Sequence, residues 1–137
     1  MAPDLRQQAV ASTAGSPYML QLVGHYLAAY AQDDGTVGEP QLTEATRAAR
    51  FDFQTDVCET TLAALSEKDV EFLAAMSQDQ DESRTAEVAE RMGVSVDYAQ
   101  KYRRRLIDAG VIRTSGRGKV SFAVPYLGDY LRRRTAE

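Results

Sequence analysis

The sequence predicts a mainly α-helical protein in two parts, a helical segment over residues 1–64 and a second domain over residues 65–137. Three observations support this prediction. Apolar residues recur every three or four positions through much of the chain, and serine, proline and glycine stand where helices would begin and end. Two short β-type runs flank a glycine-rich turn near the C-terminus. With 137 residues, 44% of them hydrophobic, the chain can bury a substantial core.

The first part contains one well-marked helix and one long helical stretch. Ser16 is a candidate N-cap and Pro17 suits the first helical position. Apolar residues then recur on one face between Met19 and Tyr30, until the polar and glycine-containing run 33–38 breaks the pattern. The stretch from Leu42 to Leu65 predicts one long helix or two stacked ones.

The second part opens with another capped helix. Ser66 precedes Glu67 and Asp69, an arrangement that favours an N-cap with acidic residues in the first turn, and the helix is expected to end near Ser77. The run 78–84 is interpreted as a polar, acidic loop. Its carboxylates lack the remaining ligands of a calcium loop, so a solvated loop is the better interpretation.

A pair of short helices follows. Thr85 is a candidate cap for a helix over 86–92, Gly93 suits a left-handed helix end, and Ser95 is a candidate cap for a helix over 96–109. Two helices joined by so short a turn form a helix-turn-helix unit. The residues of the second helix expected to face the core are Ala99, Tyr102, Leu106 and Ala109.

The next stretch predicts a small β-hairpin. Residues 106–112 resemble the "L-x-x-A-G-[LV]-[IV]" signature that leads from the recognition helix into the wing of winged helix-turn-helix families. Strands are expected over 111–114 and 120–124, joined by a glycine-rich tip, and a last helix over 126–134. The fold expected for 65–137 is therefore a winged helix-turn-helix domain with a small β-hairpin wing.

Charge is unevenly distributed along the chain. Residues 1–84 carry 5 Lys and Arg against 14 Asp and Glu, a net charge of −9, whereas residues 85–137 carry 11 against 6, a net charge of +5. A basic domain favours a polyanionic partner, although arginines can also simply solvate helix faces. Double-stranded DNA is the expected partner.

A helix fits the major groove of B-DNA, and its N-terminal half reaches the base edges. The candidate base-contacting residues are Asp97, Tyr98, Gln100 and Lys101. The candidate phosphate-contacting residues, which position a domain without reading sequence, are Arg104, Arg105, Arg113, Arg117 and Lys119. Asp97 is unfavourable beside phosphates but can accept a hydrogen bond from cytosine, and Arg117 could enter a minor groove.

Residues 14–27 resemble the "G-x-P-Y-x-L-Q-L-x-G-x-x-L" stretch in the helical lid of bacterial and archaeal AAA-type P-loop ATPases. In that family the lid precedes a C-terminal winged helix domain, so the resemblance implies that this chain is the C-terminal region of a larger ATPase, whose core would be a partner. The chain departs from the family because it has no G-x-x-x-x-G-K-[ST] loop, and its one Gly-Lys pair precedes Val120. No arginine stands in 16–30 to reach a γ-phosphate. We therefore expect no cofactor and no enzymatic activity in this chain.

Two classes of function remain open. The first is a DNA-binding module of a larger ATPase or regulator. The alternative is a protein-interaction module that couples an ATPase core to a partner without binding DNA, because fold does not fix function. A homo-oligomer is compatible with either.

The remaining composition limits location and chemistry. No run of roughly 18 apolar residues predicts a membrane span, and a single cysteine, Cys58, favours a reducing, cytoplasmic setting. Cys58 is expected to fill the core. His25, the one histidine, has no ligand-type residue at metal-binding spacing, so no metal site is expected.

Overall fold

The structure is a computed structural model that describes residues 1–136 and divides into two compact units. The first unit spans Met1–Val57, and the second begins at Cys58. The sequence interpretation had placed this division later, between residues 64 and 65.

The earlier division has a packing cause. The Cys58 thiol lies 3.9 Å from the carbonyl oxygen of Pro125, and the hydroxyl of Tyr130 donates a hydrogen bond to Glu59 at 3.3 Å. Leu62 is buried in the same region of the chain. The segment 58–64 therefore belongs with the C-terminal unit.

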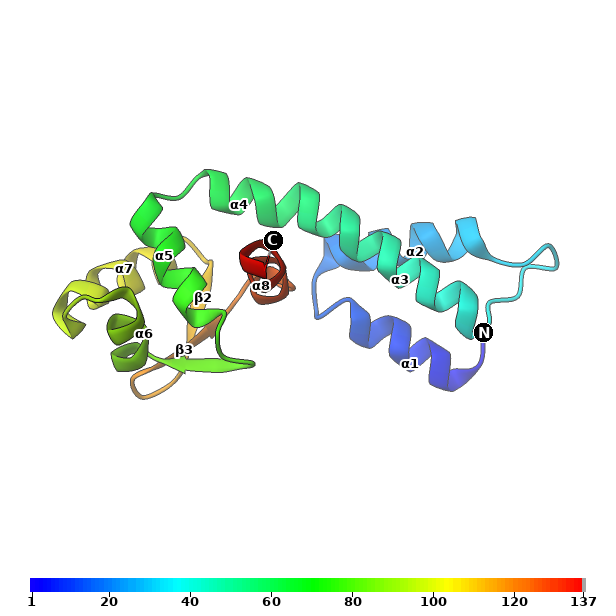
Figure 1. The fold of residues 1–137 in the computed structure, drawn as a ribbon. Helices are drawn as coiled ribbons and strands as arrows, with labels where there is room; N and C mark the ends of the chain where they lie inside the picture. The colour runs from blue at the N-terminus through cyan, green and yellow to red at the C-terminus, as the bar shows by residue number, and fades with distance from the viewer. Residues whose placement is uncertain (137) are drawn as a thin grey trace. The chain divides into compact units, whose positions relative to one another are not determined.

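The first unit is formed by the helices α1 (Pro3–Ser12), α2 (Pro17–Tyr30) and α3 (Glu39–Phe53), and Figure 1 shows α2 beside α3. The helix α2 begins as predicted, because the Ser16 hydroxyl accepts a hydrogen bond from the Met19 amide at 3.2 Å. The helix α1 was not expected, and it buries only Ala9. A helix with so little apolar face has almost no periodic signal in its sequence.

Apolar and polar contacts both join α2 to α3. The Tyr18 hydroxyl donates to Asp56 at 2.5 Å, and the Tyr26 hydroxyl donates to Asp52. The buried residues of these two helices are Met19, Val23, Leu42, Ala45, Ala49 and Phe53.

The long helical stretch expected over 42–65 is helical, but it is not one regular helix. After α3 come a π-helical turn, η1 (Gln54–Cys58), and a short α4 (Glu59–Ala63). A π-helical turn inserts an extra residue into the hydrogen-bonded repeat. It therefore changes the face that the following residues present, which a fixed helical period cannot predict.

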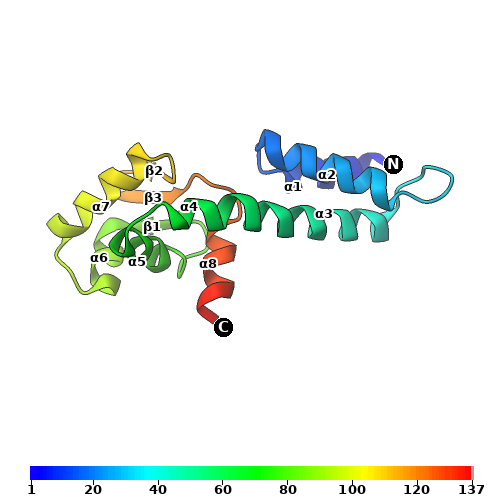
Figure 2. The ribbon, with the colours of Figure 1, turned by 90° about the horizontal axis from the view of Figure 1, so that it is seen from above.

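The second unit is mainly helical with a small three-stranded antiparallel sheet, as expected for its class. Its elements are α5 (Glu67–Met76), β1 (Glu82–Arg84), α6 (Thr85–Met92), α7 (Val96–Asp108), β2 (Ile112–Gly116), β3 (Lys119–Phe122) and α8 (Leu127–Ala136). The helices α5, α6 and α7 pack against one another, and α7 leads into β2 (Figure 2).

The strand β1 corrects the interpretation of 78–84 as a loop. Its three residues pair antiparallel with β3, so that the strand order is β1-β3-β2. Only Ser83 of the three is buried, and its hydroxyl donates to the Met76 carbonyl oxygen at 3.2 Å. A three-residue strand with a serine as its inward residue carries no apolar alternation, which explains why the sequence did not indicate it.

A short turn joins α6 to α7 as predicted. Gly93 ends α6 in the left-handed conformation, with φ at 70°. The Ser95 hydroxyl then accepts a hydrogen bond from the Tyr98 amide at 3.1 Å and caps α7. Ala89 is buried, as expected for a small residue where two helices approach closely.

Two details of this region differ from expectation. Thr85 is the first residue of α6 and not its cap, because its amide donates to the Gly118 carbonyl oxygen at 2.9 Å and its side chain is buried. Ala109 is exposed, because the chain is already leaving the helix there, and Val111 is buried in the following turn. This hydrogen bond from the Thr85 amide joins the start of α6 to the β2–β3 hairpin.

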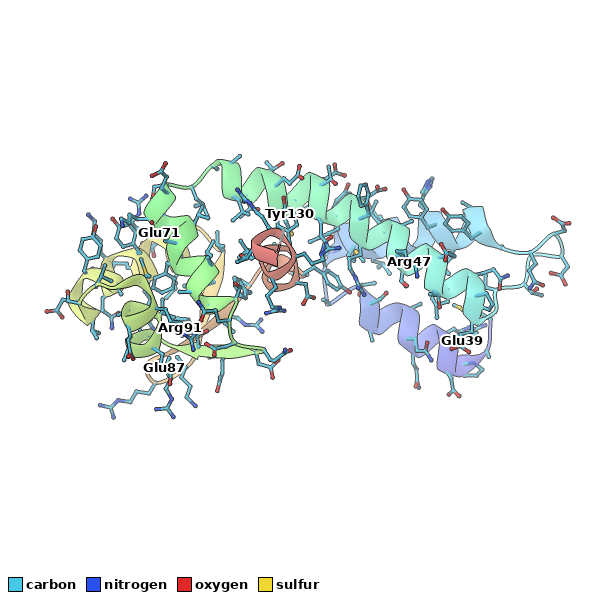
Figure 3. All side chains as sticks on the ribbon, in the orientation of Figure 1. Glu39, Arg47, Glu71, Glu87, Arg91 and Tyr130 are labelled. Carbon is cyan, nitrogen blue, oxygen red and sulfur yellow. The ribbon has the colours of Figure 1, made fainter. Side chains whose placement is uncertain are left out.

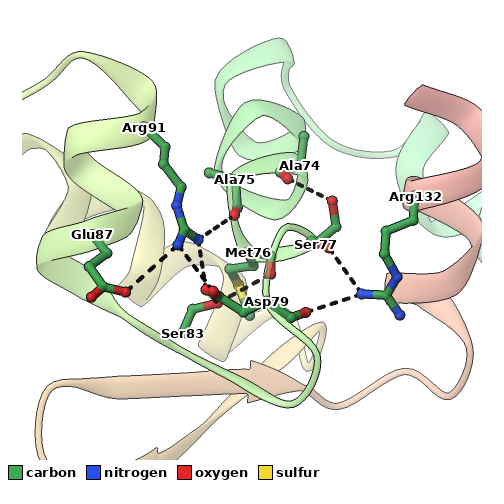
Figure 4. Close-up of polar contacts among 9 residues, drawn as sticks. All are labelled: Ala74, Ala75, Met76, Ser77, Asp79, Ser83, Glu87, Arg91 and Arg132. Atoms are coloured by element: carbon green, nitrogen blue, oxygen red, sulfur yellow. Dashed lines mark hydrogen bonds and ion pairs between the residues drawn. The ribbon is translucent and has the colours of Figure 1, made fainter. Parts of the chain in front are cut away.

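An ion-pair network holds the loop between α5 and β1 (Figure 4). The guanidinium of Arg91 contacts both carboxylate oxygens of Asp79, at 2.6 and 3.0 Å, and also the Ala75 carbonyl oxygen. Arg132 of α8 donates to the carbonyl oxygens of Ser77 and Asp79. These arginines satisfy carbonyl groups at and just beyond the end of α5 that have no intrahelical partner.

We predict that Gly93→Ala lowers the free energy of unfolding by about 1 kcal/mol, because an L side chain is strained in the left-handed region. A Cβ at this position would meet no atom within 4 Å, so backbone strain alone is tested. Urea unfolding followed by circular dichroism measures the change.

The matched control is Gly24→Ala, where a Cβ also meets nothing within 4 Å but the residue lies inside α2. This substitution should raise stability by about 0.5 kcal/mol, because glycine weakens a helix interior. Shifts in the same direction for both variants would contradict the conformational explanation.

Candidate nucleic-acid interface

The helix α7 divides cleanly into a buried and an exposed face. Ala99, Tyr102 and Leu106 are buried, as predicted. Four of the candidate site residues lie on the exposed side of the helix: Asp97, Gln100, Lys101 and Arg104. The amphipathic pattern therefore predicted the orientation of this helix correctly.

Tyr98 lies at the edge of the exposed face. Its side chain is 40% exposed, its ring lies 5.4 Å from that of Tyr102, and the two hydroxyl oxygens are 3.4 Å apart. The Lys101 ammonium lies 5.6 Å from the centroid of the Tyr102 ring. The apolar body of Tyr98 is therefore partly packed on its neighbour.

Arg105 is already paired with a carboxylate, whereas a phosphate-contacting arginine is expected to be unpaired before DNA binds. Its Nη2 lies 3.0 Å from Oδ2 of Asp69, and its Nε lies 3.2 Å from Oδ1, so the guanidinium holds both oxygens of one carboxylate. Asp69 is only 1% exposed. Removing Arg105 from this pair would leave a carboxylate in the protein interior with fewer partners. Arg105 therefore anchors α7 to α5, and its role as a phosphate contact stays a prediction.

Asp69 also completes the cap of α5. It accepts hydrogen bonds from the Ser66 amide and hydroxyl at 3.1 and 2.8 Å, while the Ser66 hydroxyl accepts from the Asp69 amide. Burial alone would raise the pKa of this carboxyl, but the hydrogen bonds from Arg105 and Ser66 outweigh it and hold the pKa below its usual value.

The hairpin β2–β3 carries the remaining candidate residues. Arg113 donates from Nε to the Ser121 hydroxyl at 3.3 Å, and Lys119 is paired with Glu82 of β1 at 3.2 Å. The hydrogen bond from Lys119 keeps the pKa of Glu82 below its usual value. Arg117 is exposed at the tip, next to Gly118, whose φ of 71° suits glycine.

Three cations of the site differ from the others in their surroundings. Among residues 1–136, Lys101, Arg104 and Arg117 have neither an ion pair nor a side-chain hydrogen bond. The sequence interpretation also missed Arg84, which lies opposite Lys119 in the register of β1 with β3. The absent signal for β1 is the reason.

A comparison with known families identifies this unit. A family model described as a domain of unknown function, DUF8462, matches residues 55–131, which is more than half of the chain. The chain belongs to the DUF8462 family. The matched range contains α5 to β3 with the first half of α8, so the DUF8462 region carries all of the candidate interface. No curated protein and no solved structure matches the chain.

The cysteine and the carboxylates of the described residues form no second site. No group of three or more His, Cys, Asp or Glu residues in 1–136 could hold a metal ion. The compact unit that begins at Cys58 and contains most of the family match is called the DUF8462 unit below. Cys58 itself is fully buried, and burial raises the pKa of its thiol to about 11. None of the described helices combines the length and the apolar character needed to cross a bilayer.

We predict that Asp69→Asn lowers the free energy of unfolding at pH 7 by on the order of 2 kcal/mol, because it removes a buried charge-assisted pair. Arg105 is 54% exposed, so water can solvate it in the variant and the loss stays at the lower end of the range for buried pairs. Urea unfolding at several pH values measures the effect.

The sign of the pH dependence follows from the lowered pKa of Asp69 in the folded state. The stabilisation is present above the unfolded pKa of about 3.9 and is lost as pH falls through the folded value, so wild type and variant should converge in acid. Asp97→Asn, at an exposed carboxylate, is the control. A difference between wild type and Asp69→Asn that is constant from pH 7 to pH 2 would contradict this account.

Proposed function

We propose that the DUF8462 unit is a winged helix-turn-helix domain that binds double-stranded DNA, with α7 in the major groove and the β2–β3 hairpin as the wing. The observation that supports this most is the exposed face of α7, where Lys101 and Arg104 are close to one turn apart and have no ion-pair partner among residues 1–136. Unpaired cations on a groove-sized helix suit phosphate and base contacts.

The order of the elements supports the same function. Two helices joined by a tight turn are followed directly by an antiparallel hairpin, and Arg117 lies at its exposed tip. In a helix-turn-helix protein the second helix enters the major groove. In this unit the second helix is α7, whose exposed side carries Gln100 and Lys101 in its N-terminal half.

The set of phosphate contacts is smaller than the sequence suggested. Arg105 is committed to Asp69 and Lys119 to Glu82. The cations proposed to meet DNA are therefore Lys101 at the base edges and Arg104, Arg113 and Arg117 on phosphates. Three neutralised phosphates correspond to a log–log salt slope of about −2.7.

A second candidate function has its own support. An open groove of about 670 Å³ lies among α5, α6 and α8, and it includes Ala74, Ala75 and Met92 in its lining. The rest of its lining is polar or charged, with Lys68, Glu71, Arg91 and Arg132 among it, which suits a partner surface that carries both apolar and charged side chains. A protein-interaction role for this unit, with an ATPase core as partner, rests on this groove and on the lid-like residues 14–27, and the relation to an ATPase stays a prediction.

We predict that the full chain binds a generic labelled duplex and that affinity falls steeply from about 50 to 200 mM salt. The double variant Lys101→Ala, Arg104→Ala should reduce the salt slope by about 0.9 and weaken binding at least about tenfold, because one phosphate contact and one base contact are lost. Fluorescence polarisation measures both quantities.

Arg47→Ala is the control, because Arg47 is an exposed arginine on α3 of the other unit (Figure 3). It should leave affinity unchanged. Equal affinity of the double variant and wild type would reject α7 as the DNA-contacting element. No binding at the lowest salt would favour the protein-interaction role.

A further inference from the structure

The exposed stripe of α7 has acidic ends. Positions 97, 101, 104 and 108 are separated by four, three and four residues and so share one helix face. All four are exposed. The stripe therefore reads Asp97, Lys101, Arg104, Asp108, with the two cations between two carboxylates.

Asp97 has little structural use. The cap of α7 is already supplied by Ser95, whose hydroxyl accepts from the Tyr98 amide. Across the described residues, the Asp97 carboxylate forms no side-chain hydrogen bond and no ion pair. Its stabilising roles are weak ones, the attraction of a carboxylate to the positive end of a helix and to the Lys101 ammonium one turn later.

A carboxylate in this position restricts which DNA the helix can enter. It is repelled by phosphates and by every base-edge acceptor, and in the major groove only cytosine N4 and adenine N6 carry donors. The adenine amino group lies beside the N7 acceptor, which a carboxylate also meets. Cytosine, whose amino group has no such neighbour on its own ring, is therefore the base that Asp97 fits best.

We propose that Asp97 is a specificity-determining residue that selects a cytosine at one position of the site, whereas Lys101 and Arg104 supply affinity. This inference rests on the proposed DNA-binding function. It gives the positive and negative residues of the stripe separate roles. The two cations attract any duplex, whereas the Asp97 carboxylate disfavours most base sequences.

Asp108 provides a matched control on the same helix. It is an exposed carboxylate on the same stripe, at the last residue of α7, and it lies eleven residues or roughly 16 Å from Asp97 along the helix axis. The end of the helix that enters the groove is the N-terminal one. Asp108 should therefore repel phosphates without reading a base.

The test uses the full chain and a pool of duplexes with a randomised centre. Selection with wild type yields a preferred sequence, and fluorescence polarisation then compares four duplexes that differ at one base pair. We expect wild type to prefer cytosine at that position by at least about fivefold, the usual lower range for one base pair. Asp97→Ala should bind all four within about twofold of one another and bind generic duplex more tightly than wild type.

Asp108→Ala should also bind generic duplex more tightly, but it should keep the preference for cytosine. Circular dichroism of both variants checks that α7 is intact. A wild type without a cytosine position, or an Asp97→Ala variant that keeps the wild-type preference, would overturn this inference and leave duplex binding intact. Failure of wild type to bind any duplex would overturn the proposed function together with the inference.

Discussion

The pairing of Asp69 with Arg105 is the partly buried polar contact that joins α5 to α7. A carboxylate that is 1% exposed needs donors on every side, and here they come from the cap residue Ser66 and from a guanidinium on another helix. The start of α5 and the second half of α7 are therefore held by one side chain. Ala99, Tyr102 and Leu106 turn one face of α7 to the core, and Arg105 borders the exposed stripe on the other face.

The other end of α5 is fixed by a comparable arrangement. Arg91 from α6 and Arg132 from α8 donate to carbonyl groups at or just after the last turn of α5, and both meet Asp79. Every helix of the DUF8462 unit from α6 to α8 thus has a polar link to α5, beside the apolar core of Phe72, Leu73 and Met76. Apolar packing supplies most of the stabilisation between these helices, and the charged hydrogen bonds add specific geometry.

Local signals allowed much of this fold to be predicted. Ser16, Ser66 and Ser95 each mark a helix start that the structure reproduces, and Gly93 marks a helix end, because these residues act on backbone groups within three or four positions. The exposed side of α7 was predictable for the same reason, since helical periodicity is a local property.

Long-range partners were not predictable. Asp69 and Arg105 are 36 positions apart in sequence, and Glu82 meets Lys119 across a sheet whose first strand has no apolar pattern. Two of the nine candidate site residues, Arg105 and Lys119, therefore looked unpaired in the sequence but form ion pairs in the structure. Lys101, Arg104, Arg113 and Arg117 are then the cations of the candidate interface without an ion-pair partner among residues 1–136.

The single cysteine of the chain has a practical consequence. Cys58 is fully buried against the Pro125 carbonyl group, and its thiol is protonated at neutral pH because its pKa is raised to about 11. The thiolate is the form that attacks a thiol reagent, and here it meets the reagent only when the segment opens. Under native conditions the labelling rate of the Cys58 thiol therefore reports how often the start of α4 separates from the rest of its unit. The natural cysteine serves as the probe, so no engineered residue is needed.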